Sequence, residues 1–382
     1  CFCVRGGSGG GSSGISGRSS SRSKRVESVV DGEDKDVTDE RRIISSSSSN
    51  PSGGDDFVVR TSNLRKEFHT GENKKIAVDS FTIGIRSGEL LGLLGENGAG
   101  KTTTINMLVG TLTPTSGSAS VAGCDVESDI DGAHIRTGIC PQHDVLWDTM
   151  TVKEHLQFYS AMKGVSSEQV GRHVDASLRD VGLENISGRY AGQLSGGMKR
   201  RLSIAIAMSG DSEVVFLDEP TTGLDPASRR AIWKIIQRAK RRKGRAIIMT
   251  THLMDEAENL CSRIGIMTQG RLRCLGEQQR LKRIYGGGYK VTVNYMESSF
   301  SLVEMMMGKV IEGDRGGGNE GGGKLMLTNR FDGQSTWKVV ELPVSAVFEH
   351  LQRESTEHGV TDWGIGQTSL DDVFQFIVAK YN

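Results

Sequence analysis

The stretch GENGAGKTT at residues 95–103 is the feature that most narrows what this chain can fold into. It follows the apolar run ELLGLLG at 89–95, which is typical of a buried strand, and it contains the pattern G-x-x-x-x-G-K-[ST]. Glycines let successive backbone N–H groups turn inward around an anion, and a helix that begins at the loop adds its positive dipole end. The sequence therefore predicts a strand, a phosphate-binding loop and a helix in succession. The residues expected to surround the phosphates are Gly95, Glu96, Asn97, Gly98, Ala99, Gly100, Lys101, Thr102 and Thr103.

Two residues of this loop and one later motif predict how a nucleotide is held. Lys101 supplies a compact positive charge for the β- and γ-phosphates, and the Thr102 hydroxyl can bind Mg²⁺. In VVFLDEP at 214–220, four apolar residues end in Asp218, at the carboxyl edge of a predicted strand, where open α/β sheets bind ligands. We expect Asp218 to help hold Mg²⁺ and Glu219 to act as general base for an attacking water. ATP and Mg²⁺ are therefore the predicted ligands.

Gln142 and His252 are expected to complete the catalytic site. His252 ends the run AIIMTTH at 246–252, whose strand should lie beside the strand that bears Asp218. A histidine that leaves a buried strand is often only structural, but here a neutral imidazole would contact the γ-phosphate and orient the water. Gln142 lies in CPQHD, where its amide can reach Mg²⁺ or water. We predict a catalytic role for both.

Phe68 and Asp225 each allow two interpretations. Phe68, in LRKEF, can stack on adenine, or it can be a core aromatic at the end of a strand. Asp225, in TTGLDP, is an ordinary helix N-cap followed by proline, and a capping residue can also face a bound partner.

A second glycine pair occurs far downstream, in LSGGM at 194–198. A predicted helix follows it, so Ser195, Gly196 and Gly197 present N–H groups and a hydroxyl at a helix N-terminus, which favours an anion. This segment belongs to a helical block, away from the phosphate-binding loop, so one chain cannot easily close both on one ATP. A second copy arranged head to tail solves the problem and gives two equivalent sites.

The order of predicted elements indicates an α/β fold with a mostly parallel sheet. We place the catalytic domain at 57–285, with an inserted helical subdomain at about 143–205. A small α+β domain is expected at 286–382, interrupted by a Gly-rich insertion at 313–323. Residues 1–56 are rich in Ser and Gly and are expected to be a disordered tail.

Composition limits the partners. Lys+Arg and Asp+Glu each total 47, so the net charge gives no pull toward nucleic acid, and none is expected as a partner. The six cysteines are scattered, without zinc spacing, as in a reducing compartment. No apolar run is long enough to cross a bilayer. Because the chain starts with Cys, we expect a fragment of something longer, whose membrane part lies elsewhere.

Taken together, GENGAGKTT, Gln142, LSGGM, VVFLDEP, Leu224–Asp225 and His252 occur in an order and spacing that resemble the nucleotide-binding domain of ATP-binding cassette (ABC) transporters. The segments CPQHDVLWDTMTVKEHLQFYSAMKG, THLMDEAENLCSRIGIM and GIGQTSLDDVF resemble subfamily A more closely. LSGGM matches the signature motif of the ABC transporter family. The match covers roughly residues 57–285.

This resemblance implies a P-loop ATPase cassette followed by a small α+β regulatory domain. It implies a second cassette as partner, a transmembrane domain that docks near Gln142, and a place on the cytoplasmic face of a membrane. Members of subfamily A mostly move lipids or sterols, so a lipid-like substrate is implied. The insertion at 313–323 departs from the family pattern, and the N-terminal tail has no usable match.

Two other classes remain open at this point. A soluble ABC-type ATPase acting on ribosomes or DNA usually carries two cassettes or a long coiled coil, and neither is present. A non-hydrolysing regulatory module conflicts with intact Lys101, Asp218, Glu219 and His252. A GTPase is disfavoured because the sequence lacks an [NT]-K-x-D base-reading motif.

Overall fold

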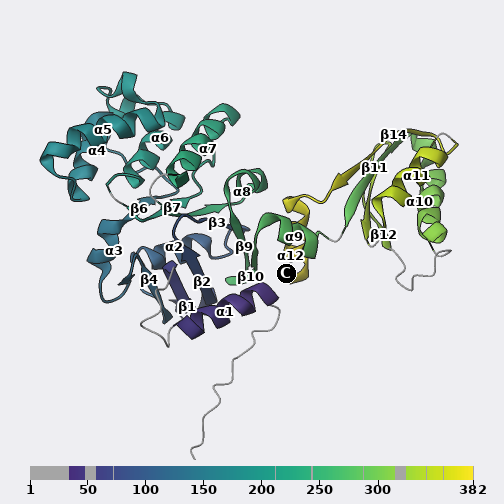
Figure 1. Ribbon diagram of the computed structural model, residues 1–382, viewed down its shortest axis with the longest axis horizontal. Helices are drawn as coiled ribbons and strands as arrows, with labels where there is room; N and C mark the ends of the chain where they lie inside the picture. The colour runs from purple at the N-terminus through teal and green to yellow at the C-terminus, as the bar shows by residue number, and fades with distance from the viewer. Residues whose placement is uncertain are drawn as a thin grey trace, which may run out of the picture. The chain divides into compact units, whose positions relative to one another are not determined.

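The structure is a computed structural model, and it describes residues 34–47, 57–71, 73–210, 212–241, 244–286, 288–314, 324–340, 342–355 and 357–381. Its centre is a six-stranded sheet in the order β10-β9-β3-β8-β7-β6 (Figure 1). Five strands run parallel: β3 (Leu90–Gly95), β6 (Thr137–Cys140), β7 (Val214–Asp218), β8 (Ala246–Thr251) and β9 (Arg263–Thr268). Strand β10 (Arg271–Gly276) pairs antiparallel with β9.

The central strands have continuous apolar sequences because both faces of the sheet are covered. Every residue of β3, β7 and β8 is buried. The three strands are adjacent and parallel, so their carboxyl ends meet at one edge of the sheet. The predicted α/β fold with a mostly parallel sheet is confirmed, as is the prediction that the strand before His252 lies beside the strand that bears Asp218.

A second, antiparallel sheet packs against the first. It has the order β2-β1-β4-β5, with β1 (Phe57–Thr70), β2 (Asn73–Arg86), β4 (Ser116–Val121) and β5 (Cys124–Asp125). Val59, Phe81 and Ile83 of this sheet share one core with Leu93 and Phe216 of the central sheet. This core fixes the strand that leads into the phosphate-binding loop.

Between β6 and β7 the chain forms a helical block of α4 (Val152–Met162), α5 (Ser167–Val181) and α6 (Gly196–Ala207) (Figure 1). A capping box starts α4: Glu154 N donates to Thr151 Oγ1, and Thr151 N donates to the Glu154 carboxylate. Apolar residues of the block, such as Leu156 and Leu178, share a core with Val215 and Ile247 of the central sheet. The block is therefore anchored to the sheet that carries the site.

Five more α-helices of the described residues belong to this part of the chain. Helix α2 (Lys101–Leu108) follows the phosphate-binding loop, and α3 (Ile130–Arg136) precedes β6. Helix α7 (Pro226–Arg241) begins just after Asp225, and α8 (Met254–Leu260) begins just after His252. Helix α9 (Gln278–Tyr285) follows β10.

The expectation of a wholly disordered N-terminal tail is wrong for residues 35–47, which form helix α1 (Lys35–Ser47). Val37 and Ile44 are buried, and Arg280 binds the Asp36 carboxylate through two nitrogens, at 2.7 and 2.6 Å. Glu40 pairs with Arg263 at 2.6 Å and accepts from Gly84 N at 2.9 Å. Composition could not reveal this helix because its partners lie far away in the sequence. Residues 1–33 and 48–56 lie outside the described ranges.

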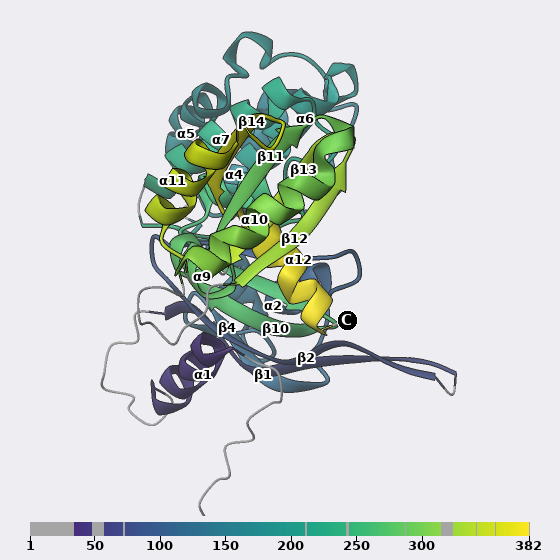
Figure 2. The same cartoon turned by 90° about the vertical axis from the view of Figure 1, so that its right-hand side faces the viewer.

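The C-terminal part has a β-α-β-β-α-β order, the ferredoxin-like arrangement. Its sheet β12-β13-β11-β14 carries α10 (Phe300–Asp314) and α11 (Val344–Glu354) on one face (Figure 2). The strands are β11 (Tyr289–Tyr295), β12 (Lys324–Phe331), β13 (Gln334–Val340) and β14 (Val360–Gln367). Of the expected insertion, residues 315–323 lie outside the described ranges, and Gly313 and Asp314 end α10.

The last helix, α12 (Leu370–Tyr381), differs from the expectation that it packs within the small domain. Its buried residues Leu370, Val373 and Ile377 share a core with Leu94 and Leu281, which belong to β3 and α9. A capping box precedes the helix: Asp372 N donates to Ser369 Oγ, and Ser369 N donates to the Asp372 carboxylate. The C-terminal helix therefore stabilises the nucleotide-binding part of the chain.

Candidate nucleotide-binding and hydrolysis site

The phosphate-binding loop joins β3 to α2, as predicted. Gly98 and Gly100 have φ angles of 85° and 103°, which glycine adopts without strain. A Cβ atom at Gly100 would lie 2.4 Å from the carbonyl oxygen of Ala77, so the close approach of the neighbouring strand also requires glycine. Helix α2 starts directly at Lys101. Its unpaired N–H groups and positive dipole end therefore face the loop.

Lys101 is buried and folds back over the loop. Its Nζ donates to the carbonyl oxygens of Gly95 at 2.8 Å and Glu96 at 3.1 Å. Burial lowers the pKa of Lys101, and the nearby carboxylates of Glu219, 3.9 Å away, and Asp218 act in the opposite direction. Because this ammonium group is poorly solvated, its electrostatic attraction to a phosphate oxygen is stronger than that of a solvent-exposed lysine ammonium group.

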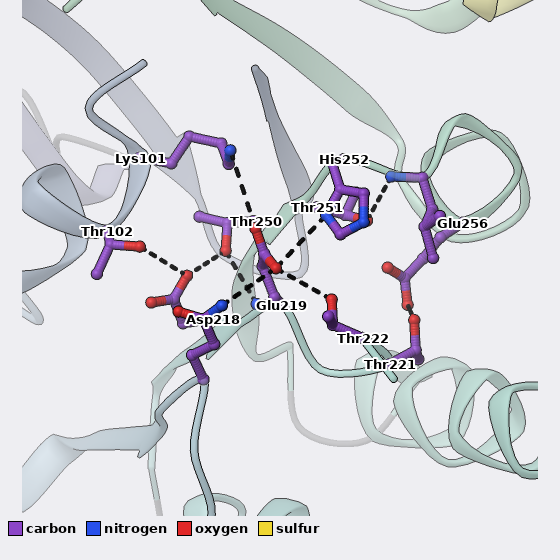
Figure 3. A network of polar contacts seen from close by, with 12 residues as sticks. Lys101, Thr102, Asp218, Glu219, Thr221, Thr222, Thr250, Thr251, His252 and Glu256 are labelled. Carbon is purple, nitrogen blue, oxygen red and sulfur yellow. Dashed lines mark hydrogen bonds and ion pairs between the residues drawn. The ribbon is translucent and has the colours of Figure 1, made fainter. Parts of the chain in front are cut away.

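Asp218 and Thr102 face each other across the loop. Thr102 Oγ1 lies 3.3 Å from Asp218 Oδ1, and Thr250 Oγ1 donates to the same carboxylate oxygen (Figure 3). Hydroxyl and carboxylate oxygens are ligands that Mg²⁺ uses together with substrate phosphates. Within the described ranges, no group of three or more His, Cys, Asp or Glu side chains is arranged to hold a metal ion. The Thr102 hydroxyl and the Asp218 carboxylate are of the ligand types that fit Mg²⁺ bound together with a nucleotide.

Glu219 sits on a strained turn at the end of β7. Its φ angle is 45°, which costs a non-glycine residue on the order of 1–3 kcal/mol. Its backbone N–H is held by Thr250, whose carbonyl and hydroxyl oxygens lie 3.2 and 3.0 Å away. The turn directs the carboxylate toward the side of the loop where Lys101 lies (Figure 3).

Three side chains converge on the Glu219 carboxylate, and Figure 3 labels two of them, Thr222 and His252. Thr222 Oγ1 donates to Oε2 at 3.0 Å, Gln142 Nε2 donates to the same oxygen at 3.4 Å, and His252 Nδ1 lies 3.4 Å from it. Gln142 follows β6 and His252 follows β8, the strands on either side of β7. The structure thus brings together Lys101, Thr102, Gln142, Asp218, Glu219 and His252.

The signature segment is not part of this cluster. Ser195 caps α6 by accepting from Met198 N at 3.3 Å, and Ser195 and Gly196 are exposed. A Cβ atom at Gly197 would lie 2.7 Å from Ser228 Oγ, so the N-terminus of α6 meets that of α7. Asp225 caps α7, accepting from Ala227 N and Ser228 N at 3.0 Å each. These bonds, those with Ser228 foremost, lower the pKa of Asp225.

Phe68 lies on β1 opposite Lys75 of β2 and is 39% exposed. Lys66 Nζ lies 5.5 Å from the centre of its ring. The ring does not belong to a hydrophobic core cluster of the described residues, so the interpretation as a core aromatic is wrong. Stacking on adenine stays a prediction.

Sequence reasoning missed several residues that shape the site. Thr250 forms hydrogen bonds with both Asp218 and Glu219. The only feature of the sequence that pointed to this residue was the threonine pair directly before His252. Glu256 is 1% exposed and accepts from Thr221 Oγ1 at 2.9 Å and Trp233 Nε1 at 3.2 Å. Burial raises its pKa. Arg200, in the basic run Lys199, Arg200 and Arg201 that follows LSGGM, is buried beneath the site.

Comparisons with known proteins agree with this geometry. Residues 78–222 match the ABC transporter family. ABC transporter A family members 7 and 6 of Arabidopsis thaliana are 40% and 43% identical over 91% and 82% of this chain. Member 9 of Dictyostelium discoideum is 39% identical over 91%. The chain spans 36%, 33% and 39% of these relatives' lengths, respectively.

Two solved structures share the fold. The ATP-binding subunit of an ABC transporter is 27% identical, with a TM-score of 0.55, over 60% of this chain and 93% of that one. A dimeric ATP-binding cassette in a post-hydrolysis state, bound to ADP and Pi, has a TM-score of 0.53 at 24% identity. That alignment covers 57% of this chain and 98% of that cassette.

A phosphate-binding loop beside an acidic strand end, with a signature helix on an inserted block, defines an ATP-binding cassette ATPase domain. The chain belongs to the ABC transporter family, and its nucleotide-binding domain is of the subfamily A type. None of the helices within the described ranges is long and apolar enough to span a bilayer.

Proposed function

We propose that this chain binds ATP with Mg²⁺ and hydrolyses it with Glu219 as general base, to drive transport across a membrane. The observation that carries the proposal is the convergence of Gln142, Thr222 and His252 on the Glu219 carboxylate, close to Lys101. General base catalysis needs a carboxylate held beside the γ-phosphate. A site that only binds nucleotide has no need for such an arrangement.

Each residue has a role in the proposed reaction. Lys101 and the N–H groups at the start of α2 bind the β- and γ-phosphates, and Glu219 takes a proton from the water that attacks the γ-phosphate. His252 and Gln142, on either side of Glu219, orient that water. Asp218, Thr102 and Gln142 would hold Mg²⁺, which when bound neutralises charge on the phosphate oxygens.

The exposed signature supports pairing with a second cassette. Ser195 and Gly196 are open to solvent at the N-terminus of α6, next to that of α7, so two positive helix ends face outward. A second cassette in head-to-tail arrangement would place its ATP there, while its own signature closes the site around Lys101. The partner cassette belongs to the same polypeptide or to another chain, which includes a second copy of this one.

An apolar surface formed by residues of α3, β6, α4 and α6 supports a docked membrane part. A groove of about 390 Å³ is lined by Ile135, Ile139, Tyr159, Met162 and Ile206, among others. Trp147, which is exposed, stacks on Tyr159 and contacts the exposed Phe158 edge to face. Exposed apolar patches of this kind mark interaction sites. We propose that the transmembrane domain docks here and keeps the cassette at the cytoplasmic face of the membrane.

The proposed cargo is lipid-like. This proposal rests on the similarity to subfamily A, since the substrate path would lie in a membrane part. Reconstitution of the full-length transporter with labelled lipid would test it.

Hydrolysis is tested by phosphate release from the purified chain with MgATP. The chain should release phosphate, and Lys101→Ala should abolish release and weaken ATP binding, because the buried ammonium is lost. Lys153→Ala, at an exposed position of α4, is the matched control and should behave as the native chain. Phosphate release by Lys101→Ala at the native rate would refute the proposal.

A further inference from the structure

Arg200 connects three parts of the site that the proposed mechanism treats separately. It lies in α6, five positions after Ser195, and is 5% exposed. A guanidinium group carries five donors, and burying its charge is costly unless these donors are paired. The identity of its partners therefore indicates what the buried charge does.

One end of the guanidinium group holds the segment that follows β6. Its Nη1 donates to the carbonyl oxygens of Pro141 at 2.5 Å and Gln142 at 3.3 Å. The same nitrogen pairs with Asp144 Oδ1 at 3.1 Å. This segment carries the Gln142 amide that reaches Glu219.

The other side of the group holds the turn that follows β7. Nη2 donates to the carbonyl oxygens of Asp218 at 2.8 Å and Glu219 at 3.1 Å, and Nε donates to that of Pro220 at 2.8 Å. These are the backbone atoms of the strained turn that directs the Glu219 carboxylate. One rigid, planar side chain therefore fixes the two segments relative to each other.

We infer that Arg200 is a positioning residue. It sets the distance between Gln142 and Glu219, and it links both to the helix whose N-terminus is offered to the partner's ATP. This inference rests on the proposed function. Because Arg200 belongs to α6, the position of this helix and the position of the segment that carries the general base depend on each other.

The geometry explains why arginine is needed. Its six acceptors lie on two segments and are reached by three nitrogens in one plane. A lysine ammonium is a single point and cannot bind both segments in this way. Arg200→Lys should therefore keep the buried charge near Asp144 but lose the fixed relation between the segments.

The chain supplies a matched control in the next residue. Arg201 Nη1 donates to the carbonyl oxygens of Val181 at 3.0 Å and Gly182 at 3.1 Å, at the C-terminal end of α5. These contacts hold the helical block together but do not touch the segments after β6 or β7. Arg201→Met removes the same chemical group from the same helix without removing the proposed link.

Two measurements on the full chain test the inference. In the first, hydrogen exchange is followed in peptides that cover residues 138–148 and 214–224. Arg200→Met and Arg200→Lys should speed exchange in both peptides together, whereas Arg201→Met should leave both as in the native chain. Unchanged exchange in Arg200→Met would overturn the inference. This measurement needs no turnover, so it remains decisive even if the native chain hydrolyses no ATP, a result that would count against the proposed function alone.

In the second, kcat and KM for MgATP are compared. Displacing a catalytic group by about 1 Å can cost roughly 10²-fold in rate, so Arg200→Met should lower kcat by up to that factor. KM should change little, because Lys101 and the loop are untouched, and Arg200→Lys should recover only part of the rate. Arg201→Met should retain the native kcat. Equal losses in the Arg200 and Arg201 variants, or a change in KM alone, would show that Arg200 only stabilises the fold.

Discussion

The side-chain nitrogen of Gln142 lies 3.4 Å from Glu219 Oε2, although 77 positions separate the two residues in the sequence. They meet because β6 and β7 are parallel neighbours and both residues follow the carboxyl ends of those strands. The same carboxylate oxygen is approached by Thr222 and His252. One carboxylate oxygen of Glu219 is thus contacted by three side chains, and the first prediction below depends on this residue.

Glu219→Gln should reduce ATP turnover by about 10²–10⁴-fold, the usual contribution of a general base. Binding of ATP should persist, because Lys101 and the start of α2 are unchanged. Turnover is measured by phosphate release and binding by equilibrium dialysis. Glu213→Gln is the matched control, because Glu213 precedes the same strand at its opposite end and is half exposed. A Glu219→Gln chain that hydrolyses ATP at the native rate would disprove this assignment.

Removal of Mg²⁺ by EDTA should stop turnover, because phosphoryl transfer depends on the metal charge. Asp218→Asn should raise the Mg²⁺ concentration needed for half-maximal turnover, since an amide oxygen is a weaker ligand than a carboxylate. Asp175→Asn, at an exposed position of α5, serves as control. If the Asp218 variant and the control required the same Mg²⁺ concentration, Asp218 would not be a metal ligand.

Phe68→Ala should weaken ATP binding by about 1–3 kcal/mol, the range measured for stacking between a base and an aromatic ring. Phe68→Tyr should retain native affinity, since it keeps the ring. The dissociation constant is measured for ATP and for inorganic triphosphate, and only the affinity for ATP should fall. Phe331→Ala removes another exposed ring and is the control. An equal loss of affinity for triphosphate would place Phe68 near the phosphates instead.

Glu256→Gln should change how stability depends on pH. Burial raises the pKa of Glu256, so its neutral form is favoured in the folded state. Its contribution to stability is complete below its ordinary value near 4.5 and is lost as the pH rises through the raised value. The variant should therefore gain stability relative to the native chain as the pH rises above 4.5, as measured by urea unfolding. The exposed Glu168→Gln should show no such trend, and a difference that is constant with pH would contradict the prediction.

Sequence motifs alone were enough to predict much of this site. The phosphate-binding loop, the acidic end of β7 and the strand before His252 could be predicted because short apolar runs lead directly into them. Their meeting at one sheet edge followed from the parallel arrangement. Predictions of this kind succeed when the position of a residue depends on its immediate neighbours.

Residues whose role depends on distant partners could not be predicted. Arg200 lies in a run of three basic residues, and nothing in that run distinguishes the buried Arg200 from the partly buried Lys199 and Arg201. Helix α1 has the composition of a solvated segment, but Asp36 and Glu40 pair with Arg280 and Arg263, more than two hundred positions away. Contacts with residues far away in the sequence stabilise both the buried Arg200 and helix α1. The composition of a segment does not indicate such contacts.

The most direct test of the account is complementation between two inactive variants. Lys101→Ala destroys the phosphate-binding half of each site and Ser195→Arg destroys the signature half, so neither chain alone should hydrolyse ATP. In a head-to-tail pair of one of each, one site receives an intact loop and an intact signature. Random pairing makes half of the pairs mixed, so the mixture should recover about one quarter of native turnover.

Lys101→Ala mixed with Glu219→Gln is the control, because both changes affect the same half-site and the mixture should stay inactive. Phosphate release by the first mixture and not by the second is the result that this account predicts. Equal inactivity of both mixtures, while the native chain turns over, would show that the site is not shared between copies.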